Sequence, residues 1–129
     1  MEEFKKNINT TRKPDDVIKV ILGNTSNNKI VKDPVKIHRA IYSLTKQDQW
    51  KPYLKDFYFN LSSISPFSDQ LDQVISRLET SYLLSTPTPR YDSYTLQKDY
   101  LLEAMAKFDE EDHIILKEMA KEFEALISH

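Results

Sequence analysis

The chain of 129 residues has no cysteine and a single glycine, and each scarcity excludes a class of site. Without cysteine there is no disulfide, no thiol nucleophile and no thiolate metal ligand, which suits a reducing cytoplasm. One glycine leaves no glycine-rich loop that could cradle a phosphate. No apolar run reaches the roughly 18 residues that a membrane-spanning helix needs, and the first residues lack the apolar stretch of a secretory signal. We therefore expect a cytoplasmic protein without a membrane segment.

The overall composition is that of one globular domain. Hydrophobic residues make up 40% of the chain and charged residues 29%, and a chain of this length has room for one core. The formal net charge of −2 hides an uneven distribution: residues 1–55 carry 12 Lys and Arg against 6 Asp and Glu, whereas residues 56–129 carry 6 against 14. Either these charges only solvate the surface, or the two halves face partners of opposite sign.

Local signals at the start of the chain predict an arm, a helix and a strand. Residues 1–13 are polar and are expected to form a flexible N-terminal arm. Pro14 and the two aspartates after it are typical of a helix start. Gly23 fits a left-handed cap at the end of that helix, and residues 29–31 fit a short strand.

Two further helices are predicted from their first turns and their apolar spacing. Asp33 and Pro34 form an N-cap and first position, and the helix that they open runs to about Lys46. The turn at residues 65–68 leads into a third long helix with an apolar stripe that continues to Tyr82. The three predicted helices are the parts of a trihelical core.

The remaining patterns predict strands and a helical C-terminus. Asp56–Leu61 alternates apolar and polar residues, which is typical of a half-buried strand. Residues 83–96 hold two short β-prone segments around a tip with two prolines, and therefore predict a hairpin. A helix is expected at residues 98–107, and the four acids at residues 109–112 suit the start of a last helix.

This order of elements predicts a mostly helical α+β fold of winged helix-turn-helix type. Residues 14–97 supply the winged-helix-like core, in which the hairpin is the wing. Because a tight helix-turn-helix allows a turn of only about 3–4 residues, the predicted strand between the second and third helices has to be an insertion. Residues 98–129 form a C-terminal helical extension.

The stretch Lys36-Ile37-His38-Arg39-Ala40-Ile41-Tyr42 resembles the second helix of the YwgA-like family of small bacterial and archaeal winged-helix proteins. The likeness continues through Asp56-Phe57-Tyr58-Phe59 and Ser65-Pro66-Phe67-Ser68, and it covers roughly residues 30–97. Ser65 and Ser81 stand where that family usually has glycine. A weaker likeness exists to Panacea-type antitoxin domains. The resemblance implies a winged helix with a prophage-associated or defence-associated role and little chemistry of its own.

A basic stripe motivates the hypothesis of duplex DNA binding. Its residues lie before and on the second helix and at the wing tip, where they would neutralise phosphates; they are Lys29, Lys32, Lys36, Arg39, Lys46 and Arg90. The third helix argues against this hypothesis. It carries Asp69, Asp72 and Glu79 against the single Arg77, whereas a helix that reads bases normally presents basic or amide side chains.

The last helix motivates a second hypothesis, an interaction module. Its apolar positions form two adjacent stripes, wider than a small core usually needs. One stripe could pair with a protein partner or with a second copy in a homodimer, or both could complete the core. The candidate interaction residues are Ile115, Met119, Phe123 and Leu126.

Catalysis is the weakest hypothesis. The three histidines, His38, His113 and His129, show no metal-ligand spacing, and no serine lies in a nucleophile elbow. We expect no enzyme, no catalytic residue, no cofactor and no metal. The sequence predicts a non-catalytic winged-helix regulator or interaction module: either a DNA-binding transcriptional regulator, or a protein-interaction subunit such as an antitoxin-like or phage-defence partner.

Overall fold

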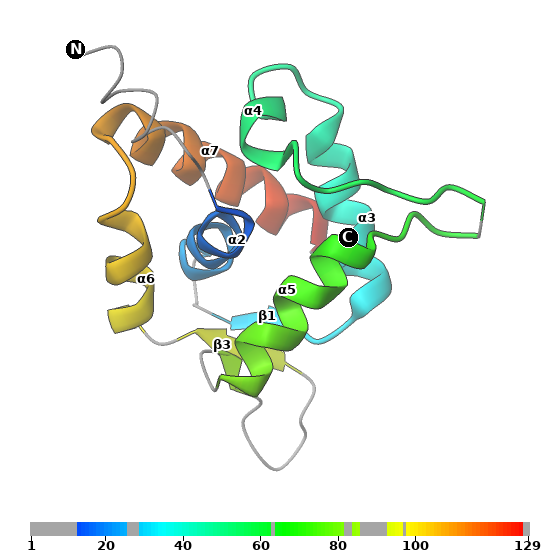
Figure 1. Cartoon of the computed structure of the whole chain (residues 1–129), viewed down its shortest axis with the longest axis horizontal. Helices are drawn as coiled ribbons and strands as arrows, with labels where there is room; N and C mark the ends of the chain where they lie inside the picture. The colour runs from blue at the N-terminus through cyan, green and yellow to red at the C-terminus, as the bar shows by residue number, and fades with distance from the viewer. Residues whose placement is uncertain are drawn as a thin grey trace.

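The computed structural model describes residues 13–25, 29–62, 64–81, 84–85, 93–96 and 98–127. The described chain is mostly helical with a small antiparallel sheet (Figure 1), which confirms the α+β class. The elements are α2 (Pro14–Gly23), β1 (Lys29–Val31), α3 (Pro34–Thr45), α4 (Lys51–Leu54), α5 (Asp69–Thr80), β2 (Leu84–Ser85), β3 (Ser93–Leu96), α6 (Lys98–Met105) and α7 (Glu110–Ile127). Among these helices, none is both long enough and apolar enough to cross a membrane.

Helix α2 is the central element of the fold. It starts as predicted, with Pro14 in its first turn and Asp15 and Asp16 after it. A helix that is apolar on nearly every side has to be enclosed by other elements, and α2 contacts α4, α5, α6 and α7. Figure 1 shows it in blue at the middle of the molecule. Its fully buried apolar residues are Val17, Ile18, Val20, Ile21 and Leu22.

Gly23 is not the left-handed cap that the sequence predicts. It is the last residue of α2, and the cap position falls on Asn24 with a φ of −94°. The reason for a glycine is instead the close approach of neighbouring elements. A Cβ at Gly23 would lie 2.7 Å from Cδ1 of Leu101 on α6 and 2.9 Å from Cδ2 of Leu96 on β3.

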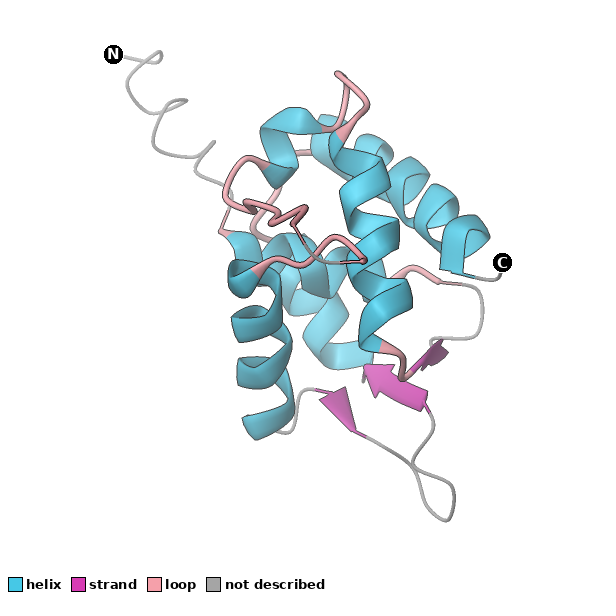
Figure 2. Ribbon diagram, turned by 90° about the vertical axis from the view of Figure 1, so that its right-hand side faces the viewer, coloured by secondary structure: helices cyan, strands magenta, loops and turns pink. Residues whose placement is uncertain are grey.

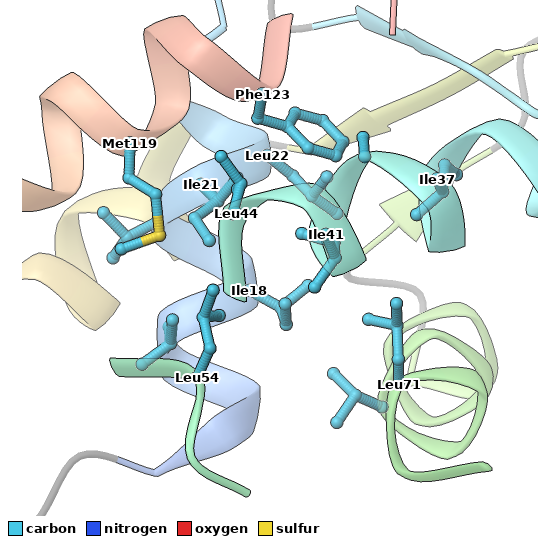
Figure 3. Close-up of a cluster of buried hydrophobic side chains, with 14 of the residues drawn as sticks. Ile18, Ile21, Leu22, Ile37, Ile41, Leu44, Leu54, Leu71, Met119 and Phe123 are labelled. Carbon is cyan, nitrogen blue, oxygen red and sulfur yellow. The ribbon is translucent and has the colours of Figure 1, made fainter. Parts of the chain in front are cut away.

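Helix α3 confirms the prediction from its N-cap. The carboxylate of Asp33 accepts a hydrogen bond from the backbone N–H of Lys36 at 3.2 Å, and Pro34 occupies the first turn. The apolar positions Ile37, Ile41 and Leu44 are buried at helical spacing. Local capping therefore defines where α3 begins, and its apolar stripe defines which side faces α2 and α7 (Figure 3).

The predicted strand Asp56–Leu61 is wrong. The segment is irregular apart from a single bridge, in which the backbones of Asn60 and Phe67 exchange hydrogen bonds of 2.7 and 3.2 Å. The burial follows the predicted alternation only in part. Phe57 is buried and Tyr58 is exposed, as the alternation predicts, but Leu61, which should be buried, is exposed. A strand needs a neighbouring strand along its length, and this segment pairs with another backbone only at the single bridge between Asn60 and Phe67. The loop consequently carries no inserted strand.

The predicted hairpin and short strand form one sheet of order β1-β3-β2. Strand β3 pairs antiparallel with β2, with Leu84 opposite Leu96, and with β1, with Ile30 opposite Tyr94. Figure 2 shows these strands below the helices. The two-proline tip of the hairpin lies outside the described residues, as does the predicted N-terminal arm before Lys13.

Helices α6 and α7 complete the hydrophobic core. Helix α6 packs on α2, and α7 packs on both α2 and α3. Met119 and Phe123 of α7 lie among the apolar side chains of α2 and α3 (Figure 3), and neither has exposed surface. The acidic start of α7 also has a packing role, because the buried Asp112 accepts a hydrogen bond of 2.5 Å from the Tyr53 hydroxyl. The C-terminal helices thus share one core with the rest of the described chain.

Candidate functional site

Two of the six predicted DNA-contacting residues lie together on α3. Lys36 and Arg39 are exposed and border a small hollow that Leu126 of α7 also lines. Within the described part of the chain, neither side chain forms an ion pair. One guanidinium nitrogen of Arg39 donates to the Ser65 hydroxyl at 3.4 Å. These two cations are therefore available to an external anion.

The other predicted basic residues do not join them. The ammonium of Lys32 lies 4.0 Å from the carboxylate of Glu79 on α5. Lys46, at the end of α3, holds its ammonium 4.6 Å from the ring centroid of Tyr42. The structure does not describe the side chains of Lys29 and Arg90. A continuous basic stripe from β1 to the hairpin tip is thus not assembled by the described residues.

Helix α5, which the sequence predicts as the third helix, presents acids to solvent. Asp69 and Asp72 are exposed on it. Its arginine, Arg77, donates two hydrogen bonds of 2.7 and 3.0 Å to the carboxylate of Asp15 on α2. Because the charge of Arg77 is already compensated by Asp15, the exposed carboxylates of Asp69 and Asp72 make this surface of α5 repel phosphates.

The candidate interaction residues on α7 are divided between core and edge. Met119 and Phe123 are fully buried in the chain's own core, so a partner that docks on the folded chain does not reach them. Ile115 and Leu126 are partly buried and pack against the same core. The described α7 therefore keeps no free stripe made of these four side chains.

The most conspicuous apolar surface lies elsewhere, and sequence reasoning missed it. Among the described residues, most of the exposed large hydrophobic side chains belong to the segments 31–35 and 58–67. The second segment projects beside α3 (Figure 1). Together the two segments enclose an open cavity of about 440 Å³. We call its apolar lining the apolar patch: Pro34, Val35, Ile64, Pro66 and Phe67.

His38 lies in the wall of this cavity and joins its two segments. Its ring stacks on Phe67 with 4.5 Å between centroids and 4° between planes. Its Nδ1 accepts a hydrogen bond of 3.0 Å from the backbone N–H of Ser68, the N-cap residue of α5. The imidazole therefore helps to hold the 64–68 turn against α3, together with the hydrogen bond from Arg39 to Ser65.

The hydrogen bond and the burial of His38 together define its protonation. Burial lowers the pKa of the imidazole from its usual value of 6.5, and the charge of Asp72 only partly opposes this. The ring is thus neutral at pH 7, and since Nδ1 is an acceptor, the proton lies on Nε2. Among the described residues this Nε2–H has no acceptor. A buried donor left unpaired costs about 1–3 kcal/mol.

The other described histidine is structural. Nε2 of His113 lies 2.6 Å from the carbonyl oxygen of Met105, and so links the start of α7 to the end of α6. Across the described ranges, no group of three His, Asp or Glu side chains is arranged to hold a metal ion.

The sequence contains two separate features that belong to the apolar patch, but no pattern that joins them. Val35 and His38 are one turn apart on α3 and share a side, and Ile64 is a large apolar residue in a serine-rich and proline-rich turn. Neither feature shows that the two segments meet.

Comparison of the chain with protein-family models, with curated proteins and with solved structures gave no match in any of the three.

Proposed function

We propose that this chain is a non-catalytic interaction module of winged-helix topology, which docks a protein partner on its apolar patch. Three helices, α2, α3 and α5, are followed by a hairpin, and the strand after the first helix pairs with the second hairpin strand. This order and pairing support a winged-helix topology, in which β2 and β3 form the wing and the short helix α4 is an addition between α3 and α5. The resemblance to the YwgA-like group and to Panacea-type antitoxin domains accords with the proposal and stays a prediction.

The observation that carries the proposal is the exposure of large apolar side chains around one cavity. Ile64 is fully exposed, and Val35 keeps 49% of its surface. A contiguous apolar surface of this kind on a folded chain marks a binding site, because leaving it in water is costly. A rim of cations beside an apolar centre is also the usual anatomy of a protein interface.

The chemistry of the cavity favours binding over catalysis. A general base needs a free ring nitrogen near a proton to be removed. In His38 the acceptor nitrogen is occupied by the Ser68 N–H and the other nitrogen carries the proton. Neither ring nitrogen is therefore free to accept a proton, which supports a non-catalytic role for this cavity.

Glutamates placed in the apolar patch are expected to abolish partner binding. The double variant Val35→Glu/Ile64→Glu puts charges where a partner would bury apolar surface, and since both side chains are exposed, the fold should persist. Tagged chains are incubated with extract of the native host, and the retained proteins are compared by mass spectrometry. The matched control is Leu102→Glu/Ile114→Glu, because these residues are 61% and 62% exposed on α6 and α7.

The expected result is a protein that the wild-type chain and the control retain and the patch variant does not. After purification, that protein should bind the wild-type chain and the control but not the patch variant. Equal retention by all three chains, or no protein that depends on the patch, would contradict the proposal.

DNA binding is the second candidate function, and the exposed Lys36 and Arg39 are the observation that favours it. If it holds, the chain binds random-sequence duplex DNA with an affinity that falls steeply with salt, and Lys36→Glu/Arg39→Glu abolishes binding in an anisotropy titration. Because α5 is acidic, we expect no binding at physiological salt. DNA binding would become the preferred function if the wild-type chain bound DNA with micromolar affinity at physiological salt. That binding would have to be lost in Lys36→Glu/Arg39→Glu and kept in Lys117→Glu/Lys121→Glu on α7.

A further inference from the structure

We infer that the partner's docking segment is an acidic peptide with a large apolar anchor residue, which enters the cavity beside His38 while its carboxylates pair with Lys36 and Arg39. The inference rests on the proposed function, that a protein docks on the apolar patch. Its support comes from the extent of the apolar surface and from the charge at its edge.

The extent of the apolar surface favours a peptide over a small molecule. The cavity of about 440 Å³ falls within the range of roughly 300–1,000 Å³ that is usual for ligand sites. Such sites, however, bury most of a small ligand and of their own lining, whereas here Ile64 is fully exposed and Leu61 and Tyr58 of the same loop are also exposed. An extended segment whose anchor fills the cavity would cover this loop as well.

The charge at the edge of the cavity favours an acidic segment. Arg39 is bonded to Ser65, which lines the cavity, so its guanidinium lies at the rim. Lys36 lies one turn before it on the same side of α3. Arg77 and Lys32, by contrast, have carboxylate partners within the fold. Two cations without such partners beside an apolar surface complement carboxylates brought by a partner.

The test is a selection from random short peptides displayed on phage, with the whole chain as bait. Peptides are first depleted on Val35→Glu/Ile64→Glu and then selected on the wild-type chain, so that only sequences that depend on the apolar patch remain. The expected result is enrichment of sequences with one large apolar residue flanked by Asp or Glu. Enrichment of neutral or basic sequences, or none that depends on the patch, would overturn the inference.

The most enriched peptide is then synthesised with a fluorophore, and its affinity is measured by anisotropy. Lys36→Gln/Arg39→Gln is expected to weaken binding about fivefold, as the loss of two exposed ion pairs implies, and the affinity should fall as salt rises. Lys117→Gln/Lys121→Gln on α7 is the control of equal charge and should bind as the wild type does. Equal affinity of the cation variant and its control would overturn the assignment of an acidic segment.

The two proposals fail in different ways. If a host protein depends on the patch while the selected peptides are not acidic, the interaction module stands and the partner's chemistry is different. If no host protein depends on the patch, the interaction module itself is wrong.

Discussion

Replacing Phe123 with aspartate is expected to unfold the chain. Phe123 of α7 has no exposed surface and packs against α2 and α3 (Figure 3). Loss of a buried phenylalanine costs about 3–5 kcal/mol, and a carboxylate left unpaired in that site adds several more. The sum is comparable to the roughly 5–15 kcal/mol that stabilises a whole domain. Circular dichroism should show the variant unfolded, or melting far below the wild type.

Ile114→Asp is the control for this experiment, because Ile114 lies on the same helix and is exposed. It should melt close to the wild type. The outcome also separates two interpretations of α7. If Phe123→Asp were folded and only its oligomeric state had changed, α7 would be an interface, as its apolar stripes suggested, and the packing described above would be contradicted.

Replacing Gly23 with valine is expected to cost about 3 kcal/mol, and with alanine about 1–2 kcal/mol, as overpacking of a filled core does. An alanine is favoured over glycine inside a helix by about 1 kcal/mol, so propensity alone predicts the opposite sign. Packing should prevail, since a Cβ would lie 2.7 Å from Leu101 Cδ1 and 3.1 Å from its Cβ. Both leucines around the site are buried and have little room to move.

A double-mutant cycle tests the physical reason for the glycine. If the side chain of Leu101 is the obstacle, Gly23→Ala should cost much less in a Leu101→Ala background, with a coupling energy of about 1 kcal/mol or more. Chemical denaturation of the four chains gives that energy. Additive costs would mean that the side chain of Leu101 is not the reason for a glycine at this position.

The helices with strong local signals could be predicted from the sequence. Asp33 with Pro34 marks the start of α3, and the turn ending at Ser68 marks the start of α5, because an N-cap involves only residues within a few positions of each other. The hairpin of β2 and β3 and its pairing were also predictable, since two β-prone segments were joined by a short connection. For these elements the interacting groups are neighbours in the chain.

The candidate site could not be predicted in the same way. Lys36 and Arg39 were identified from their spacing on α3, but which of the basic residues have carboxylate partners depends on elements far apart in the chain, as for Arg77 and Asp15. The same holds for His38, whose tautomer and burial depend on Ser68, thirty residues away. Electrostatic environment is a property of the packed structure.

The amino-acid sequence by itself determined the starts of the longer helices, the apolar stripes, the hairpin and the α+β class, because each follows from interactions within a few residues, whereas the short helix α4 was not predicted. Only the tertiary structure decided which apolar side chains are buried in the core and which remain exposed to solvent. The alternating segment Asp56–Leu61 found no neighbouring strand and became a loop, Phe123 was enclosed in the core, and Ile64 was left in solvent. An apolar side chain has the same local pattern in a core as on a binding surface, and the difference arises only when distant segments pack against it or leave it exposed.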